Sequence, residues 1–457
     1  MTIIVGAVSM WGRRLGGLVA VAIVGLMCQP AQAVPSFARQ TGQSCVACHA
    51  GGQFPELTPY GRMFKLTAYT IGERSNPLSA MAVISSTTTK NNDDGAGGSL
   101  SPLNSQAILD FASIFIAGKV SDKVGGLAQY TQSFYDTQDA NGNWKGRFAA
   151  DNFDLRYADR SIDAQHDWVW GMTLHNNPSV QDVWNSTPAW GYPYVSTTKG
   201  SFGSLPASTL VEGGLAQHVA GVGGYVYINQ NFYAELTSYQ TAKGGLSFLS
   251  YGNQTGDPNN PLTHLDGNSV YWRLAYTREW GAHNAMVGAF GLDAKVFPND
   301  GTTFLPVTGL GSTHYRDFGF DAQYQYLLSP HTFTAHLRSV RERINDDTLQ
   351  VYSDGPATLN TLTAKASYVY REKYGASLAY STVTGSVDST AYSASPLLVP
   401  DSERWTPELF WMPMQSMRLG AQYNLFTRYL GASNNYDGAG RNARDNDTLY
   451  LYFWAAF

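Results

Sequence analysis

The chain has 457 residues and a formal net charge of −5, and its acidic balance argues against a nucleic-acid partner, which would need a basic surface. Hydrophobic residues make up 43% of the chain, but no run of about 20 apolar residues occurs in it, which excludes a helical membrane protein. Few charged residues (14%), many aromatic residues (13%) and 46 glycines are typical of a large β-sandwich or an outer-membrane β-barrel.

The first 33 residues have the layout of a secretory signal peptide. Arg13 and Arg14 precede the apolar run Leu15–Met27, and Ala31-Gln32-Ala33 provides a small-residue cleavage site. The apolar run is too short to cross a bilayer, so a retained anchor is disfavoured. We therefore expect residues 1–33 to be removed and the mature protein to be exported.

Residues 45–49 read Cys-Val-Ala-Cys-His, which is the C-x-x-C-H attachment motif of c-type haem. We expect Cys45 and Cys48 to form thioethers with one haem c, and His49 to be an axial ligand of its iron. A thioredoxin-like C-x-x-C or a plain disulfide is the alternative. No βαβ pattern follows the motif, and haem c is attached outside the cytoplasm, where the signal peptide directs this chain. The sequence therefore favours covalent haem.

The sixth iron ligand is less well defined by the sequence. Thr58-Pro59 predicts a helix start, with Thr58 as N-cap. On that helix Met63 is a candidate ligand and Met81 is the next methionine along the chain, but Met63 is equally suited to be a core residue beside the porphyrin. An open, water-bound or barrel-supplied sixth position is the remaining alternative. The predicted helix places the following residues on one face: Tyr60, Met63, Phe64 and Thr67.

Residues 34–77 form the predicted haem segment, which is too short to shield a haem and build a core of its own. The rest of the chain, residues 78–457, must cover it. We expect the haem segment to cap the barrel or enter its lumen, with Arg39, Gln40 and the stretch Pro55–Arg62 against the inner wall.

From Leu78 onward the chain alternates apolar and polar residues at period two. Long and short connections also alternate, which predicts an all-β fold: an antiparallel transmembrane barrel of about 16 strands with its ends in the periplasm. Trp272, Phe320 and Tyr423 are expected to face lipid, and an added arginine should be tolerated better at lumen-facing Gln323. The basic residues expected in the lumen, as possible neighbours of haem propionates, are His336, Arg338, Lys365, Arg418 and Arg428.

Both ends of the chain resemble the fused outer-membrane monohaem cytochrome–porins of iron-oxidising bacteria. The similar segments are Pro35–Gly42 before the motif, Phe54–Arg62 and Phe64–Leu66 after it, and Asn435–Ala443, Asp445–Leu451 and Phe457 at the C-terminus. The resemblance implies an outer-membrane protein that takes an electron from extracellular Fe(II) and passes it to a periplasmic c-type cytochrome.

Three functions remain open at this point. The leading one is an electron conduit, which as an enzyme would be an Fe(II):cytochrome c oxidoreductase. The second is a solute porin whose cytochrome segment is a plug or a redox gate. In the third function, the haem has only a structural role and stabilises a short segment. Acid-rich loops such as 91–94 could attract cations, although surface loops are commonly acidic and no clustered His/Glu set for catalytic iron is visible in the sequence.

Overall fold

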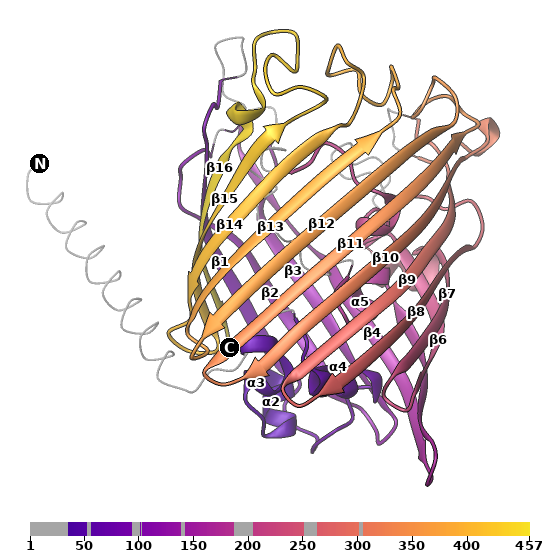
Figure 1. Cartoon of the computed structure of the whole chain (residues 1–457). Helices are drawn as coiled ribbons and strands as arrows, with labels where there is room; N and C mark the ends of the chain where they lie inside the picture. Colours follow the sequence, from indigo (N-terminus) through magenta and orange to yellow (C-terminus); the bar gives the residue numbers. More distant parts are fainter. Residues whose placement is uncertain are drawn as a thin grey trace, which may run out of the picture.

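The computed structural model describes residues 35–52, 56–93, 101, 103–138, 142–186, 204–250, 263–300 and 305–457. The predicted signal peptide and residues 53–55 lie outside the described residues. The described residues form sixteen strands in one closed barrel, antiparallel throughout, in which β1 pairs with β16 (Figure 1). This confirms the fold class predicted from the sequence.

The strands are β1 (Leu78–Thr89), β2 (Ile108–Lys119), β3 (Val124–Gln138), β4 (Trp144–Ile162), β5 (Asp167–His175), β6 (Val219–Ile228), β7 (Phe232–Thr241), β8 (Ser269–Trp280), β9 (His283–Val296), β10 (Thr313–Leu328), β11 (His331–Asp346), β12 (Ala357–Tyr370), β13 (Tyr374–Gly385), β14 (Ser402–Trp411), β15 (Met417–Arg428) and β16 (Thr448–Ala456). The helices are α2 (Pro35–Thr41), α3 (Cys45–Cys48), α4 (Pro59–Leu66) and α5 (Pro178–Gln181).

Connections at one end of the barrel are short turns, such as 229–231, 281–282 and 329–330, and we call this the turn end. Those at the opposite, loop end are mostly long, such as 176–218 and 242–268. The connection between β3 and β4, residues 139–143, is a short exception there. Both the entry into β1 and the end of β16 lie at the turn end (Figure 1).

Side chains alternate between the lumen and the outer wall as the period-two pattern predicts. In β10, Phe320 points outward and is 58% exposed, whereas its neighbour Asp321 is buried. In β8, Leu274 is exposed outward and Arg273 is completely buried inside. A sheet whose outward side chains are apolar and whose inward side chains are polar inverts the order of a soluble protein, and it is typical of a barrel surrounded by lipid.

Replacing Phe320 by arginine tests this outward face. Phe320 lies near the middle of β10, so Phe320→Arg is expected to lower the free energy of unfolding by about 2–4 kcal/mol in a bilayer. Gln240→Arg, at an exposed outward position where β7 ends, is the matched control and should cost only about 0–1 kcal/mol. Denaturant unfolding in lipid vesicles measures both, and equal costs at the two depths would contradict a lipid-facing wall.

Gln323 is less suitable as a tolerant lumen position than the sequence suggested. It faces the lumen as predicted, but it is buried and its Oε1 accepts a hydrogen bond from Arg62 at 3.1 Å. An arginine there would place a second cation against Arg62.

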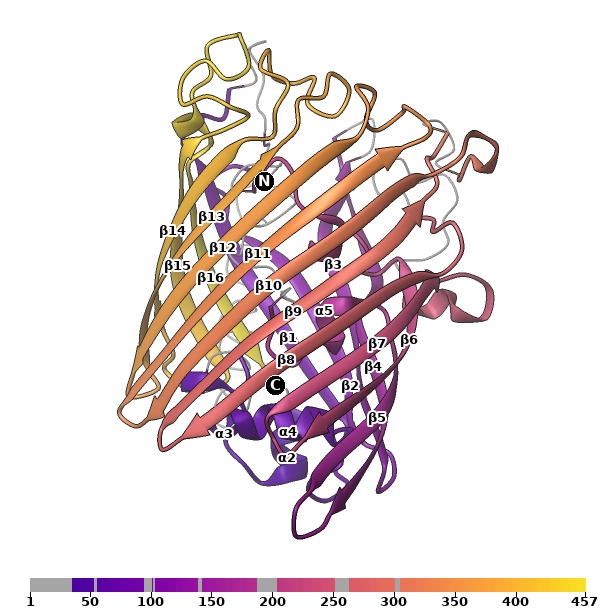
Figure 2. The ribbon, with the colours of Figure 1, turned by 45° about the vertical axis from the view of Figure 1, so that its right-hand side comes forward.

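The described residues of the N-terminal segment, 35–52 and 56–77, lie at the turn end of the barrel and carry α2, α3 and α4 (Figure 2). Thr58 caps α4 as predicted, because its hydroxyl accepts a hydrogen bond from the Gly61 backbone at 3.1 Å. Gln40 is buried against the wall, where its Oε1 accepts from the Lys119 backbone at 2.8 Å. Arg39 was expected on the inner wall, but it is exposed and donates to the Asn76 and Leu78 carbonyls.

The core of the molecule lies in the lumen, where residues 176–186, which we call the lumen loop, fold inward from the end of β5. Trp184 of this loop is 1% exposed and packs edge-on against Tyr233, with ring centroids 5.1 Å apart. Leu66 of the N-terminal segment belongs to the same apolar cluster. The barrel wall, the lumen loop and the N-terminal segment therefore share one core. The N-terminal segment packs against the barrel and is not held by its chain connection alone.

Candidate cofactor site

The C-x-x-C-H motif lies on the short helix α3 and is held by contacts on both sides. The His49 backbone N–H donates to the Cys45 carbonyl at 2.8 Å, which closes the helical turn over the motif. The Cys45 backbone N–H donates to Gln415 Oε1 at 3.0 Å, in the turn between β14 and β15. The motif is thus fixed to the barrel by a residue 370 positions away in the chain.

Helix α4 closes directly onto the motif. The Thr58 backbone N–H donates to the Cys48 carbonyl at 2.9 Å, and the Thr58 hydroxyl donates to the Ala47 carbonyl at 2.5 Å. A Cβ at Gly61 would lie 2.2 Å from the Cys48 carbonyl oxygen, so only glycine permits this approach. The approach keeps Cys48 against the first turn of α4.

Both motif cysteines and His49 line one cavity between the N-terminal segment and the lumen loop, with about 930 Å³ of empty space that includes its opening to solvent. Phe37, Phe64 and Val183 make much of its surface apolar. The cavity extends to Gln43 and Ser44, which are exposed at the turn end.

The ionisation of the motif residues suits iron ligation better than thiol exchange. Burial lowers the pKa of His49 to about 4, although a hydrogen bond with the Glu56 backbone partly opposes this shift, so the imidazole is neutral near pH 7. Neutral imidazole is the form that binds a metal. Burial and the neighbouring Cys45 raise the pKa of Cys48 to about 11. A redox-active C-x-x-C motif instead lowers the pKa of its thiol.

Glu56, seven residues after His49, anchors the segment to the barrel wall. It is 3% exposed; its Oε1 lies 2.9 Å from Lys365 Nζ, and its Oε2 lies 3.0 Å from His336 Nε2. Burial raises the pKa of Glu56, but the charges and hydrogen bonds of His336 and Lys365 outweigh it and hold the pKa well below its usual value. Glu56 is therefore ionised at neutral pH.

Arg62 of α4 is the second anchor. It is 3% exposed and donates to Asn284 Oδ1 at 2.6 Å, to Gln323 Oε1 at 3.1 Å and to Gln325 Oε1 at 3.3 Å. These three amide oxygens belong to β9 and β10, so one side chain joins α4 to two strands. Charge-assisted hydrogen bonds of this kind are roughly twice as strong as neutral ones.

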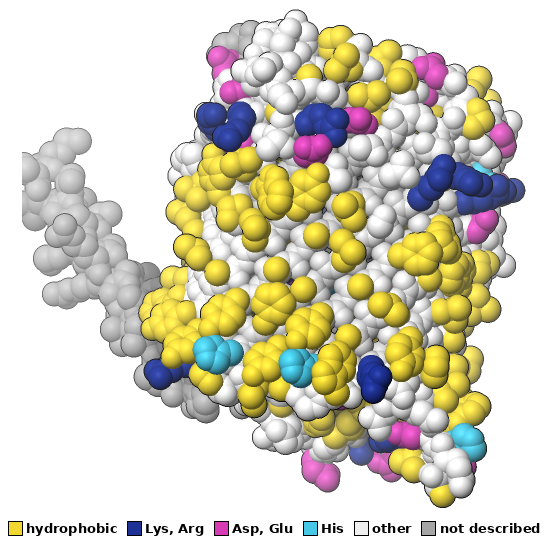
Figure 3. Space-filling model, viewed as in Figure 1, with side chains coloured by type: hydrophobic (Ala, Val, Ile, Leu, Met, Phe, Trp, Pro, Cys, Tyr) yellow, Lys and Arg dark blue, Asp and Glu magenta, His cyan; other side chains and the backbone are white. Residues whose placement is uncertain are grey.

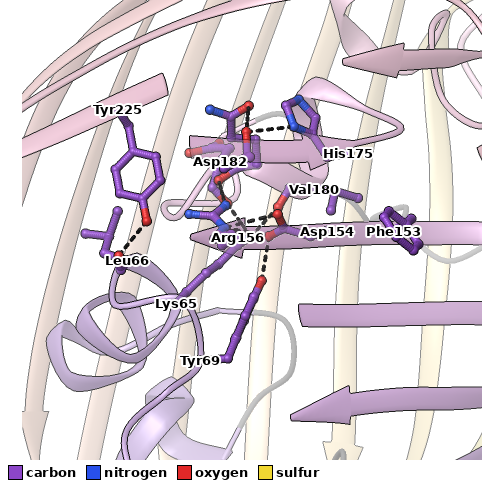
Figure 4. A network of polar contacts seen from close by, with 12 residues as sticks. Lys65, Leu66, Tyr69, Phe153, Asp154, Arg156, His175, Val180, Asp182 and Tyr225 are labelled. Carbon is purple, nitrogen blue, oxygen red and sulfur yellow. Dashed lines mark hydrogen bonds and ion pairs between the residues drawn. The ribbon is translucent and has the colours of Figure 1, made fainter. Parts of the chain in front are cut away.

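A third group of contacts joins the end of α4 to β4 and the lumen loop (Figure 4). The Lys65 ammonium group lies at the cavity wall and donates to the Val180 carbonyl and, at 3.2 Å, to the Asp182 carbonyl. The Tyr69 hydroxyl donates to Asp154 Oδ2 at 2.6 Å, and the same carboxylate pairs with Arg156 at 2.8 Å. Burial lowers the pKa of Lys65 to about 8, so the amine is mostly protonated at neutral pH.

The five basic residues expected as propionate neighbours are engaged elsewhere. His336 and Lys365 pair with Glu56, and Arg338 pairs with Glu212 at 2.6 Å. Arg418 pairs with Glu408 at 2.7 Å, and Arg428 pairs with Glu403 at 2.6 Å. The described residues that line the cavity include none of the five. Lys65, for which the sequence predicted no role, is the lysine that lines the cavity.

Met63 packs against the apolar cluster of Leu66 and Trp184. Among the described residues, the cavity lining contains Phe64 and Lys65 but not Met63. The face of α4 that lines the cavity therefore contains Gly61, Phe64 and Lys65. It is rotated by one residue from the predicted face, which contained Met63. The sixth ligand remains a prediction, with a position other than Met63 favoured by this packing.

The residues present fit a c-type haem. Two thiols at C-x-x-C spacing and a neutral imidazole line the same cavity, and aromatic and aliphatic side chains from α2, α4 and the lumen loop complete it. In the described part of the chain, no three His, Cys, Asp or Glu side chains come together as a metal site.

Among the described helices, none is both long and apolar enough to cross a membrane.

Comparisons with solved structures return outer-membrane channels. The outer membrane channel DcaP of Acinetobacter baumannii is 12% identical with a TM-score of 0.46, over 83% of this chain and 96% of that one. Salmonella typhi OmpF in complex with daunomycin gives 12% identity and a TM-score of 0.45, over 83% and 97%. An anion-selective porin from Comamonas acidovorans gives 13% and 0.43, over 83% and 98%. No family model and no characterised protein sequence matches the chain.

Proposed function

We propose that this protein is an electron-transfer protein of the bacterial outer membrane that carries one covalent haem c inside the turn end of its barrel. The observation that carries the proposal is the placement of Cys45, Cys48 and His49 on one wall of a largely apolar cavity. The proposal has Cys45 and Cys48 attach the haem and His49 bind its iron. The haem would supply a one-electron redox couple that does not diffuse away.

The chain's own residues have separate tasks in this proposal. Phe37, Phe64 and Val183 exclude water from the cavity, which raises the reduction potential of an enclosed haem. Lys65 places a cation at the cavity wall, where haem carboxylates would need one. Glu56 and Arg62 hold the motif against the barrel wall, so the cofactor would keep a fixed position during electron transfer.

The outer wall supports a position in a membrane. Hydrophobic side chains cover the wall between charged groups near the loop end and others at the turn end (Figure 3). Close to the turn end, outward aromatic residues pair with histidines, as in Trp280–His283, with ring centroids 5.5 Å apart, and His331–Tyr370, also at 5.5 Å. Aromatic bands at both edges of an apolar belt are typical of outer-membrane barrels. Export by a signal peptide is consistent with this location.

We place electron exchange with a periplasmic c-type cytochrome at the turn end. There the exposed residues Gln43 and Ser44 lead into the cavity of the motif. The extracellular donor is proposed to be Fe(II), on the resemblance of both chain ends to iron-oxidising cytochrome–porins. Its electron must cross the lumen, in which the lumen loop and Trp184 fill the space beyond the cavity.

Anaerobic mixing of the oxidised protein with Fe(II) tests the electron-conduit proposal. In vesicles that expose only the loop end, Fe(II) should produce the sharp visible bands of ferrous haem c. Dithionite in the same vesicles is the control, because it shows how much haem can be reduced. Bands that appear with dithionite but never with Fe(II) would remove Fe(II) as donor and leave the haem assignment intact.

A solute porin with a removable cytochrome plug is the second candidate. The contacts that hold the N-terminal segment to the barrel wall are non-covalent, as in the ion pair Glu56–Lys365, so a change in redox state could break them. Wild-type protein in a planar bilayer should conduct ions poorly if the plug is permanent. A large steady conductance that depends on the redox state would favour the gated porin.

A further inference from the structure

A group of basic side chains projects from the outer wall of the barrel near the loop end (Figure 3). It lies on the adjacent strands β9, β10 and β11, and we call it the basic cluster: Lys295, His314, Arg316, Arg341 and Arg343. Its residues alternate along each strand with lumen-facing ones. Arg341 and Arg343 are exposed, for example, whereas Glu342 between them is 2% exposed. The basic cluster therefore faces the surroundings of the barrel.

Strand register places like charges opposite each other in the basic cluster. Arg316 of β10 is the direct partner of Arg343 of β11, while its partner on β9 is Asp293. Directly opposed like charges destabilise a sheet unless an anion lies between them. The arrangement thus favours an anion bound from outside.

One carboxylate from the protein lies within this group of side chains. Asp293 Oδ1 is 2.8 Å from His314 Nε2, and Asp293 Oδ2 is 3.4 Å from Arg316 Nε. In the part of the chain that the structure describes, Arg341 and Arg343 form no ion pair with a carboxylate. Positive charge therefore remains uncompensated along β11.

The basic cluster adjoins the apolar wall. Arg341 is the cross-strand partner of Phe318, the outward residue that follows Arg316 on β10. Phe318 packs against Phe320 and Trp272, with ring centroids 4.8 Å and 6.0 Å away. On the outer wall, aromatic side chains are thus followed by basic ones toward the loop end. Such a boundary is typical of the depth at which the acyl chains of the membrane end and the lipid headgroups begin.

We propose that the basic cluster binds the phosphate groups of a phosphorylated lipid headgroup in the membrane leaflet at the loop end. Planar guanidinium groups bind phosphate oxygens in pairs, and Arg341 and Arg343 offer two such groups on one strand. The acyl chains of the same lipid pack on Phe318 and Phe320. The occupant is a lipid rather than a free anion, because the apolar contacts lie directly beside the charged ones. This proposal does not depend on the haem.

Binding of lipid A, a phosphorylated glycolipid, to the purified full-length protein tests the proposal. Native mass spectrometry in detergent measures the apparent dissociation constant from the fraction of protein that retains lipid A. Arg341→Gln with Arg343→Gln is expected to weaken retention roughly 30-fold, since each basic residue near an anionic surface contributes to lipid binding. Arg341→Lys with Arg343→Lys keeps the charge and should recover part of the affinity.

Arg428→Gln is the matched control, because Arg428 lies at the end of β15 near the loop end but is paired with Glu403 at 2.6 Å. It should retain lipid A as the wild type does. Equal retention by the double glutamine variant and the wild type would overturn the proposal, as would full displacement of lipid A by millimolar inorganic phosphate. A gel-mobility shift on heating confirms that each variant is a folded barrel.

Discussion

Replacing both Cys45 and Cys48 by serine is expected to abolish covalent haem attachment. The two thiols line one cavity with His49, and serine oxygens form no thioether with a haem vinyl group. Denatured wild-type protein should retain a single haem on a gel stained for peroxidase activity, and the double variant should retain none. Acid acetone should extract any haem that remains bound to the variant.

Gln43→Ala is the matched control for the cysteine variant. Gln43 lines the same cavity but is exposed at the turn end, so its loss should leave attachment unchanged. The wild type and both variants must be produced in a host whose haem-attachment machinery is intact. A wild-type chain without haem is then not caused by the host. Wild-type protein without covalent haem under those conditions would refute the haem assignment, whatever the cysteine variant does.

Glu56→Gln is expected to release the N-terminal segment from the barrel wall. The change leaves Lys365 and His336 facing a neutral amide in a buried site, where loss of one partner of a buried ion pair costs about 3–5 kcal/mol. Hydrogen exchange in α3 and α4 should therefore become faster. Ion conductance through the reconstituted barrel should rise, because the segment lies in the turn end of the lumen.

Glu73→Gln provides the control for this effect. It makes the same chemical change in the same segment, but Glu73 is exposed to solvent. Its hydrogen exchange and conductance should match those of the wild type. If Glu56→Gln also behaves like the wild type, the ion pairs with Lys365 and His336 do not hold the segment in the lumen.

Several features of the molecule were predictable from the sequence because they depend on local geometry. Period-two alternation decides which side of a strand each residue faces, so Phe320 outward and Gln323 inward followed from counting along β10. Thr58 before Pro59 predicted the start of α4, since an N-cap is satisfied within one helical turn. The C-x-x-C-H spacing likewise contains the thiols and the imidazole within five residues.

The partners of these residues could not be predicted, because tertiary structure decides them. Arg62 meets Gln323 across 261 positions, and Cys45 meets Gln415 across 370. Such pairs depend on the register of several strands and on the insertion of the N-terminal segment into the lumen. The sequence therefore predicted basic residues in the lumen as neighbours of a cofactor, whereas in the structure Lys365 and His336 pair with Glu56.

Burial explains this division between local and tertiary information. In a closed barrel every inward charge is removed from water and needs a partner, so Arg338 is neutralised by Glu212 of the long connection between β5 and β6. Lys65 reaches the cavity wall because the lumen loop offers it backbone carbonyls. The sequence by itself determined the barrel and the C-x-x-C-H motif. Only the tertiary structure decided which charges hold the motif in place and which remain available to a ligand.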